Sequence, residues 1–238
     1  MLILALDTCD ARGGVALLRD DALLRSEPHN SAEDYSSWLL PAITRLLTSA
    51  GLALRDVELY AVAAGPGSFT GVRVGLATVK AWSEVYGPSI AAVSRLEALA
   101  SHSTGSSPYA AAFIDARRNQ IFAALYRRGS AVPERIDDEM VIAPDKFLEW
   151  CSAKAGSENI DWVSTDPISL TQTPGWRSRH SLNETVQEVS AFLAPRIGQI
   201  GFRLALQNSL TDALHLDANY VRRSDAELFW KGASAHGA

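Results

Sequence analysis

The spacing of apolar residues predicts a chain in which short buried strands alternate with amphipathic helices. Apolar runs of strand length lie at 2–6, 59–64, 89–93, 109–115 and 120–126. Apolar residues at helical spacing lie at 35–50, 72–86, 145–152 and 195–207. Gly13-Gly14 and the polar residues 116–119 each mark a turn between hairpin strands. Because both halves begin with hairpin strands and continue with helices, we predict a duplicated α/β unit.

The stretch from Gly65 to Leu76 is rich in glycine and stands between a predicted strand and a predicted helix. Such a unit gathers backbone N–H groups and the positive end of a helix dipole, where an anion can bind. It has no Walker A lysine, and its third glycine comes one residue late for a dinucleotide fingerprint. Glycines can also serve only to turn a strand sharply into a helix, so both interpretations stay open. A phosphate or nucleotide here would contact Gly65, Gly67, Ser68, Thr70 and Gly71.

Two predicted strands end in a carboxylate, at Asp7 and at Asp115. Proteins of the α/β class place ligand groups at the ends of strands, and two carboxylates that face one cleft could hold a magnesium ion. Together with Thr8, they complete the candidate nucleotide-binding residues. The alternative is that each aspartate bonds to the backbone N–H groups of its own turn.

The first predicted helix begins with Ser31-Ala32-Glu33-Asp34, which has the form of a capping box, and Pro41 should bend it. Its apolar positions cover more than one stripe, so it either lies deep in a core or meets a partner. The small residues Gly75, Ala77 and Ala81 on the second helix would let the two helices pack closely. Core packing is the simpler interpretation of the pattern alone.

Composition indicates a globular chain of one large domain or two small ones, with 238 residues, 47% of them apolar, and a net charge of −5. That charge argues against a broad nucleic-acid groove on this chain alone. Cys9 and Cys151 are isolated and the histidines show no metal-ligand spacing, so neither a disulfide framework nor a metal site is predicted. No signal peptide or membrane span is predicted, and we expect a cytoplasmic protein.

The polar segment 102–108 is the predicted linker between two lobes, an N-terminal lobe at 1–103 and a C-terminal lobe at 104–238. The region 153–190 predicts only one strand, at 161–164. The late segment Asn219-Tyr220-Val221-Arg222-Arg223 is basic and aromatic. It could contact RNA phosphates, although a pair of arginines is more often a solvated end.

Several of these motifs together resemble the bacterial TsaB (YeaZ) family, the dimerisation subunit of the machinery that makes threonylcarbamoyladenosine in tRNA. The resemblance rests on residues 3–8, 65–76, 93–100, 114–118 and the late Tyr220-Val221-Arg222. It is dense as far as Arg128 and sparse from there to Asn219. The motif at 65–76 is its specific part.

The resemblance implies an actin/Hsp70-like (ASKHA) fold of the α/β class, with two lobes that are each a ribonuclease-H-like mixed sheet with helices. It implies a chain that is not itself the enzyme and binds no cofactor alone, with ATP and a metal on partner subunits. The implied partners are a TsaD-type catalytic subunit, a TsaE-type ATPase and, through the complex, tRNA modified at the adenosine next to the anticodon.

The pairing surface of this family is made by the first two helices, and in isolation the same surface could form a homodimer. On this chain it corresponds to Tyr35, Trp38, Leu39, Ala42, Ile43, Gly75, Val79, Ala81 and Trp82.

This sequence departs from the family at Tyr35, where relatives often have a histidine. The position corresponds to a metal-binding stretch of the catalytic partner, so no metal is expected here. The glycine-rich sequence that holds adenosine in actin-like ATPases is also missing, which predicts a degenerate cleft. Two enzyme alternatives stay open. One is a stand-alone nucleotide hydrolase that uses Asp7, Asp115 and the glycine loop, and the other is a metallopeptidase, against which the missing histidine pair argues.

Overall fold

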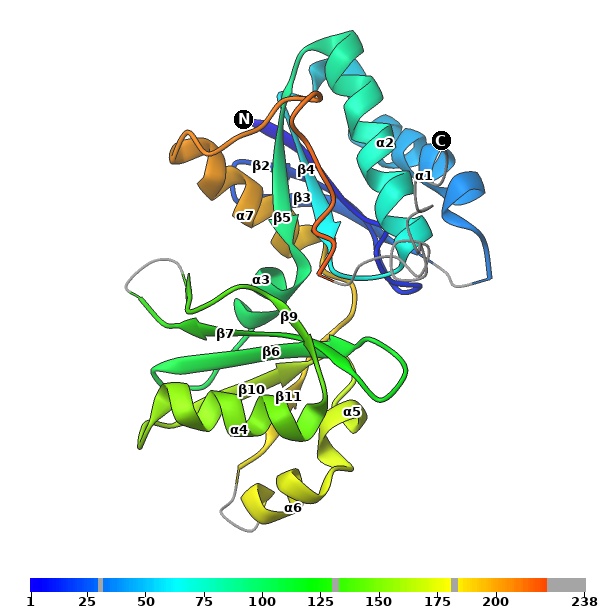
Figure 1. Cartoon of the computed structure of the whole chain (residues 1–238). Coiled ribbons are helices and arrows are strands. Elements are labelled where there is room, and N and C mark those ends of the chain that lie inside the picture. Colours follow the sequence, from blue (N-terminus) through cyan, green and yellow to red (C-terminus); the bar gives the residue numbers. More distant parts are fainter. Residues whose placement is uncertain (30–31, 130–132, 181–183, 222–238) are drawn as a thin grey trace, which may run out of the picture.

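The N-terminal lobe is built on a five-stranded sheet with the order β3-β2-β1-β4-β5 (Figure 1). The computed structural model describes residues 1–29, 32–129, 133–180 and 184–221. The strands of this sheet are β1 (Leu2–Asp7), β2 (Gly14–Arg19), β3 (Ala22–Pro28), β4 (Leu59–Gly65) and β5 (Ser89–Ser94). The first three strands are antiparallel, whereas β4 lies parallel to β1 and β5 parallel to β4.

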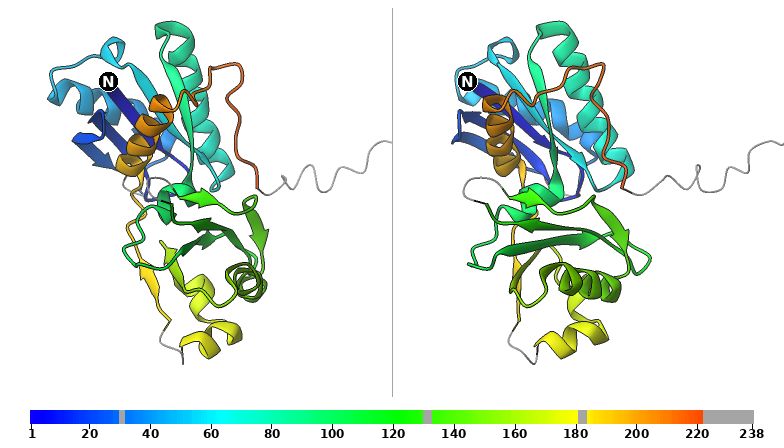
Figure 2. Two further views of the ribbon diagram at one scale, coloured as in Figure 1. Left: turned by 90° about the vertical axis from the view of Figure 1, so that its left-hand side faces the viewer. Right: turned by 60° about the vertical axis from the view of Figure 1, so that its left-hand side comes forward.

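Helices cover both faces of this sheet. The helices α1 (Tyr35–Ser49) and α2 (Phe69–Tyr86) lie on one face, and α7 (Ala194–Leu206) lies on the other (Figures 1 and 2). A 3₁₀ turn, η1 (Leu54–Asp56), precedes β4. The helix α7 approaches the strands closely because Gly201 has no side chain, and a Cβ atom there would lie 2.7 Å from that of Ala61. The buried apolar residues of α1, α2 and α7 form one core with the strands between them.

The C-terminal lobe repeats the same pattern in its own sheet, with the order β11-β10-β6-β7-β8 and with β9 paired to β7. Its strands are β6 (Tyr109–Asp115), β7 (Ile121–Arg127), β8 (Glu134–Arg135), β9 (Met140–Ile142), β10 (Ile160–Ser164) and β11 (Val186–Glu188). Its helices are α3 (Arg95–Ala100), α4 (Pro144–Ala155), α5 (Ile168–Thr171) and α6 (Pro174–His180). An antiparallel hairpin followed by parallel strands therefore occurs twice, which confirms the predicted duplication.

Two predicted helix ends are confirmed by local chemistry. Ser94 caps α3, because its Oγ accepts from the backbone N–H groups of Leu96 and Glu97. Gly87 ends α2 in the left-handed conformation, with φ of 89°. The predicted start of the first helix is wrong, because α1 begins at Tyr35 with Asp34 as its N-cap and no side-chain cap. Ser31 of the predicted capping box lies outside the described residues.

The region 153–190 contains more regular structure than its sequence predicted. In addition to β10, it holds α5, α6 and β11. The helix α5 is a single turn and the strand β11 is only Val186–Glu188. Elements this short show too few repeats of a hydrophobic period to be recognised in a sequence.

The predicted linker at 102–108 is fixed to the C-terminal lobe by side-chain hydrogen bonds. The Oγ of Ser107 donates to Oδ1 of Asp161 over 2.7 Å, and the N–H of Thr104 donates to Oε1 of Gln187 over 2.9 Å. The lobe boundary at 103/104 stays a prediction. Each sheet carries a helix from the other side of that boundary, since α3 packs on β6 and β7 while α7 packs on β1 and β4.

The C-terminal segment, residues 208–221, returns along the N-terminal lobe after α7. Thr211 pairs with Ile90, and the N–H of Asn219 donates to the carbonyl of Ala64 over 2.8 Å. This course brings Tyr220 beside the beginning of α2. In the part of the chain that the structure describes, no helix combines the length and apolarity needed to cross a membrane.

Candidate functional site

A cleft of about 1660 Å³ lies between the two lobes. Its walls are the β1–β2 turn, the loop and first turns of α2, the β6–β7 turn and the C-terminal segment. Of the candidate nucleotide residues, Thr8, Gly67, Ser68, Thr70, Gly71 and Asp115 line this cleft. Asp7 and Gly65 are buried and are not part of its wall. The topology therefore brings the predicted glycine loop and one of the two strand-end carboxylates together.

The glycine loop packs directly against the end of β1. The Oγ1 of Thr8 donates to the carbonyl of Gly71 over 2.6 Å, and the N–H of Ser68 donates to the carbonyl of Cys9 over 2.8 Å. A Cβ atom on Gly71 would collide with the carbonyl oxygen of Thr8, and one on Gly67 with that of Cys9. These glycines are thus needed for close packing, which is the ligand-free interpretation. Phosphate binding by the loop stays a prediction.

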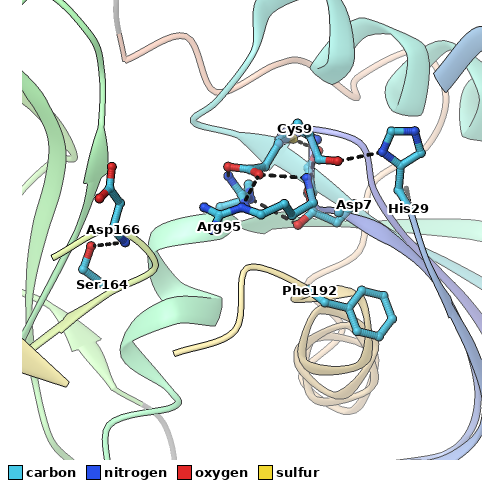
Figure 3. Close-up of polar contacts among 12 residues, drawn as sticks. Asp7, Cys9, His29, Arg95, Ser164, Asp166 and Phe192 are labelled. Atoms are coloured by element: carbon cyan, nitrogen blue, oxygen red, sulfur yellow. Dashed lines mark hydrogen bonds and ion pairs between the residues drawn. The ribbon is translucent and has the colours of Figure 1, made fainter. Parts of the chain in front are cut away.

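Beneath the cleft, Asp7 forms a fully buried ion pair with Arg95 (Figure 3). The distance from Arg95 Nε to Asp7 Oδ2 is 3.2 Å, and Asp7 Oδ1 accepts the N–H of Cys9 over 3.0 Å. Burial raises the pKa of Asp7, while the Arg95 guanidinium and the Cys9 N–H act in the opposite direction. Both carboxylate oxygens are therefore bonded within the fold, and Asp7 does not line the cleft.

Arg95 is the site residue that the sequence most clearly failed to reveal. Its Nη1 lies 3.7 Å from Oδ2 of Asp10, and its buried Nη2 has no hydrogen-bond partner within the described part of the chain. The side chain is 1% exposed yet forms part of the cleft lining. The motif around Ser94 predicted only the beginning of a helix, where an arginine is ordinarily in solvent.

Asp115 organises the β6–β7 turn. Its Oδ1 accepts the N–H of Arg117 over 2.8 Å, and its Oδ2 lies 3.3 Å from Arg117 Nη1. Arg117, Arg118 and Asn119 are all left-handed, with φ of 63°, 57° and 55°. Consecutive non-glycine residues in this conformation are costly and often mark a functional turn. The turn-forming alternative for Asp115 is thus observed, and the turn presents Arg117 to the cleft.

An aromatic cluster holds the β1–β2 turn in place from the side of α1. The Tyr35 hydroxyl donates to the carbonyl of Asp10 over 2.5 Å and accepts the N–H of Gly13 over 3.0 Å. The ring of His29 stacks on Tyr35 with centroids 4.0 Å apart, and its Nδ1 lies 2.7 Å from the carbonyl of Ala11. Burial raises the pKa of Tyr35. Among the described residues, no group of three or more His, Cys, Asp or Glu could hold a metal ion.

The predicted partner interface is mostly internal in the single chain. Tyr35 and Trp82 are half-buried, and Ala81 is exposed. The other predicted interface residues are buried: Trp38, Leu39, Ala42, Ile43, Gly75 and Val79. The exposed apolar residues of α1 and α2 include Leu40, Ala77, Val85 and the predicted Ala81, and we call these four the outer apolar face. The pairing surface itself stays a prediction.

Comparison with known proteins identifies the family of this chain. The family model described as TsaD, tRNA N6-adenosine threonylcarbamoyltransferase, matches residues 26–176, which is more than half of the chain. The tRNA threonylcarbamoyladenosine biosynthesis protein TsaB of Bacillus subtilis is 28% identical over 97% of this chain and 98% of its own length. This chain belongs to the TsaB (YeaZ) family. The TsaB of Escherichia coli is 29% identical over 69% of this chain and 70% of its own length.

Solved structures show the same fold. YeaZ from Pseudomonas aeruginosa has a TM-score of 0.72 at 24% identity and covers 92% of this chain and 99% of its own. A second structure, of an uncharacterized protein with similarity to peptidase YEAZ from Pseudomonas aeruginosa, has a TM-score of 0.74 at 23% identity and covers 93% of this chain and 99% of its own. The two-lobed ASKHA fold and the family resemblance predicted from the sequence are confirmed.

Proposed function

We propose that this chain is a non-catalytic subunit that pairs with a TsaD-type subunit and thereby supports threonylcarbamoylation of the adenosine next to the anticodon in tRNA. The relatives named above carry the tRNA pathway in their names. The finer role is that of a scaffold whose partner performs the chemistry, and two structural features support it.

The outer apolar face is the observation that carries this proposal. Leu40 on α1 is 53% exposed and Val85 on α2 is 72% exposed. Ala77 and Ala81 lie between them in sequence and leave the α2 backbone open to close approach. Helices that cover one sheet face and still expose apolar residues outward offer a surface for a partner helix pair. The TsaD family model matches residues 26–176 of this chain, which include α1 and α2. A TsaD-type subunit would therefore carry a related helix pair, and it is the partner that we propose for this face.

The buried ion pair supports the non-catalytic part. In a stand-alone hydrolase, the carboxylate at the end of β1 would have to hold a metal ion or take up a proton from water. Here Asp7 is enclosed and bonded to Arg95. Asp7 is therefore not available to form, with Asp115, the accessible pair of carboxylates that the hydrolase alternative requires.

Light-scattering mass on a sizing column, with the chain alone and mixed with a TsaD-type subunit, tests the pairing. We expect a heterodimer that replaces any homodimer formed through the same face. Ala81→Arg places an unpaired charge in that interface and should weaken pairing about a hundredfold, with an unchanged circular dichroism spectrum. Leu214→Arg, at an 81% exposed position outside α1 and α2, is the matched control and should pair normally.

A monomer that ignores the TsaD-type subunit would refute the scaffold role. Equal pairing by Ala81→Arg and the wild type would show instead that another face makes the contact. The TsaE-type ATPase, the further partner that the family resemblance implies, can be added to the preformed pair in the same experiment.

A further inference from the structure

Two exposed aromatic rings and an arginine form a fixed group at the mouth of the cleft. Phe69 opens α2, and Tyr220 lies near the end of the C-terminal segment; their ring centroids are 5.6 Å apart. The guanidinium carbon of Arg73 lies 3.7 Å from the Phe69 centroid, and Arg73 Nε donates to the Tyr220 hydroxyl over 3.0 Å. We call these three residues the aromatic platform.

The platform is exposed and yet held in place. Phe69 is 43% exposed and Tyr220 44% exposed. The residue before Tyr220 is bonded at both its backbone and its side chain, since Asn219 N–H donates to Ala64 and Asn219 Nδ2 donates to Oε2 of Glu139 over 2.6 Å. Glu139 itself lies in the C-terminal lobe. Contacts from both lobes thus hold this segment in place while the two rings stay exposed, which is typical of a binding surface.

Other walls of the same cleft carry exposed guanidinium groups. Arg12 lies 3.5 Å from Asp10, and Arg117, 88% exposed, lies 3.3 Å from Asp115. Exposed ion pairs of this kind are weak, so either arginine can exchange its carboxylate for a phosphate. At the floor, Arg95 also lines the cleft, and its buried Nη2 has no hydrogen-bond partner among the residues that the structure describes.

We propose that the mouth of this cleft binds an unpaired nucleotide of RNA, with its base stacked on the aromatic platform and its phosphates facing Arg12 and Arg117. Unpaired bases stack on aromatic rings and on guanidinium planes, whereas a duplex hides its base faces. Arginine bonds phosphate with two parallel N–H groups. A site for one nucleotide also agrees with the net charge of −5, which is unfavourable for a long nucleic-acid groove. The choice of RNA rests on the proposed role in tRNA modification.

Fluorescence anisotropy of the full chain with a labelled RNA hairpin that has an unpaired loop tests this site. We expect Tyr220→Ala and Arg73→Gln each to weaken binding about tenfold, because each removes part of the stacking surface. Tyr220→Phe keeps the ring and should retain binding. The matched control is Arg127→Gln, which removes an exposed guanidinium that covers Tyr109 in the C-terminal lobe, and it should bind like the wild type.

Two results would overturn the proposal: equal binding of a fully paired RNA duplex, or no effect of Tyr220→Ala. Because the assay uses the chain without a partner, its failure leaves pairing with the TsaD-type subunit intact. If the chain binds the RNA hairpin but does not pair with the TsaD-type subunit, only the proposed function is contradicted.

Discussion

At the scale of single residues, His102 shows how burial at the junction of the lobes is coupled to pH. Its ring follows α3, with Nδ1 2.9 Å from the carbonyl of Ala98. Burial lowers the pKa of His102; the hydrogen bond to Ala98 opposes this shift and the nearby charge of Arg196 adds to it. In the unfolded chain the same imidazole takes up a proton near its ordinary pKa of about 6.5.

We therefore expect His102 to make the protein less stable in mild acid. Between its ordinary pKa and its lowered folded pKa, the unfolded state binds more protons, so the free energy of unfolding falls as the pH falls. Urea unfolding at pH 7.5 and at pH 5.5 should show a smaller pH dependence for His102→Gln than for the wild type. An identical pH dependence in both proteins would contradict this role.

Arg95 shows what sequence reasoning misses at this scale. The terminal strand carboxylate, Asp7, could be selected as important because it ends an apolar run. Its partner could not, because the ion pair joins positions that only the folded sheet and α3 bring together. Removing one member of such a pair ordinarily costs about 3–5 kcal/mol, since it leaves a buried charge alone.

At the scale of elements, the glycine loop is fixed by close approach. Gly71 faces the backbone of Thr8, whereas Gly87 at the other end of α2 has open space around it and only a left-handed backbone to satisfy. Glycine thus allows close packing at Gly71 and a left-handed backbone at Gly87.

Replacing each of these two glycines with alanine should distinguish the steric requirement from the conformational one. Gly71→Ala forces the end of β1 and the helix apart and should destabilise the fold by about 3 kcal/mol. Gly87→Ala meets no neighbour and should cost about 1 kcal/mol for the left-handed conformation. Urea unfolding measures both values. Equal losses would show that the loop moves aside freely, and the close-packing account of Gly71 would then be wrong.

Element types were readable from the sequence where a local signal exists. The apolar runs of β1, β4 and β6, the Ser94 cap and the Gly87 stop are examples. The division of α1 into core and outer positions was not readable, because Trp38 and Leu40 look alike in a pattern that is apolar on more than one side. Only packing against the sheet separates them, leaving Trp38 6% exposed and Leu40 53% exposed.

At the scale of the whole molecule, two related sheets enclose one cleft and exchange helices. The duplicated pattern could be predicted, because each half repeats a hairpin followed by helices. The return of α7 and residues 208–221 to the N-terminal lobe could not be predicted. The local sequence around Ile197 or Tyr220 does not indicate which lobe these residues will contact. This return completes the cleft and places the aromatic platform.

The central claim is that the chain supports threonylcarbamoyl transfer without performing it, and transfer to tRNA adenosine tests this most directly. The assay compares the TsaD-type subunit mixed with wild-type chain, with Asp115→Asn or with Ala81→Arg. We expect Asp115→Asn to sustain transfer at the wild-type rate, Ala81→Arg to lose it, and the chain alone to show none. Transfer by the chain alone, or its loss with Asp115→Asn in a pair that still forms, would contradict the account.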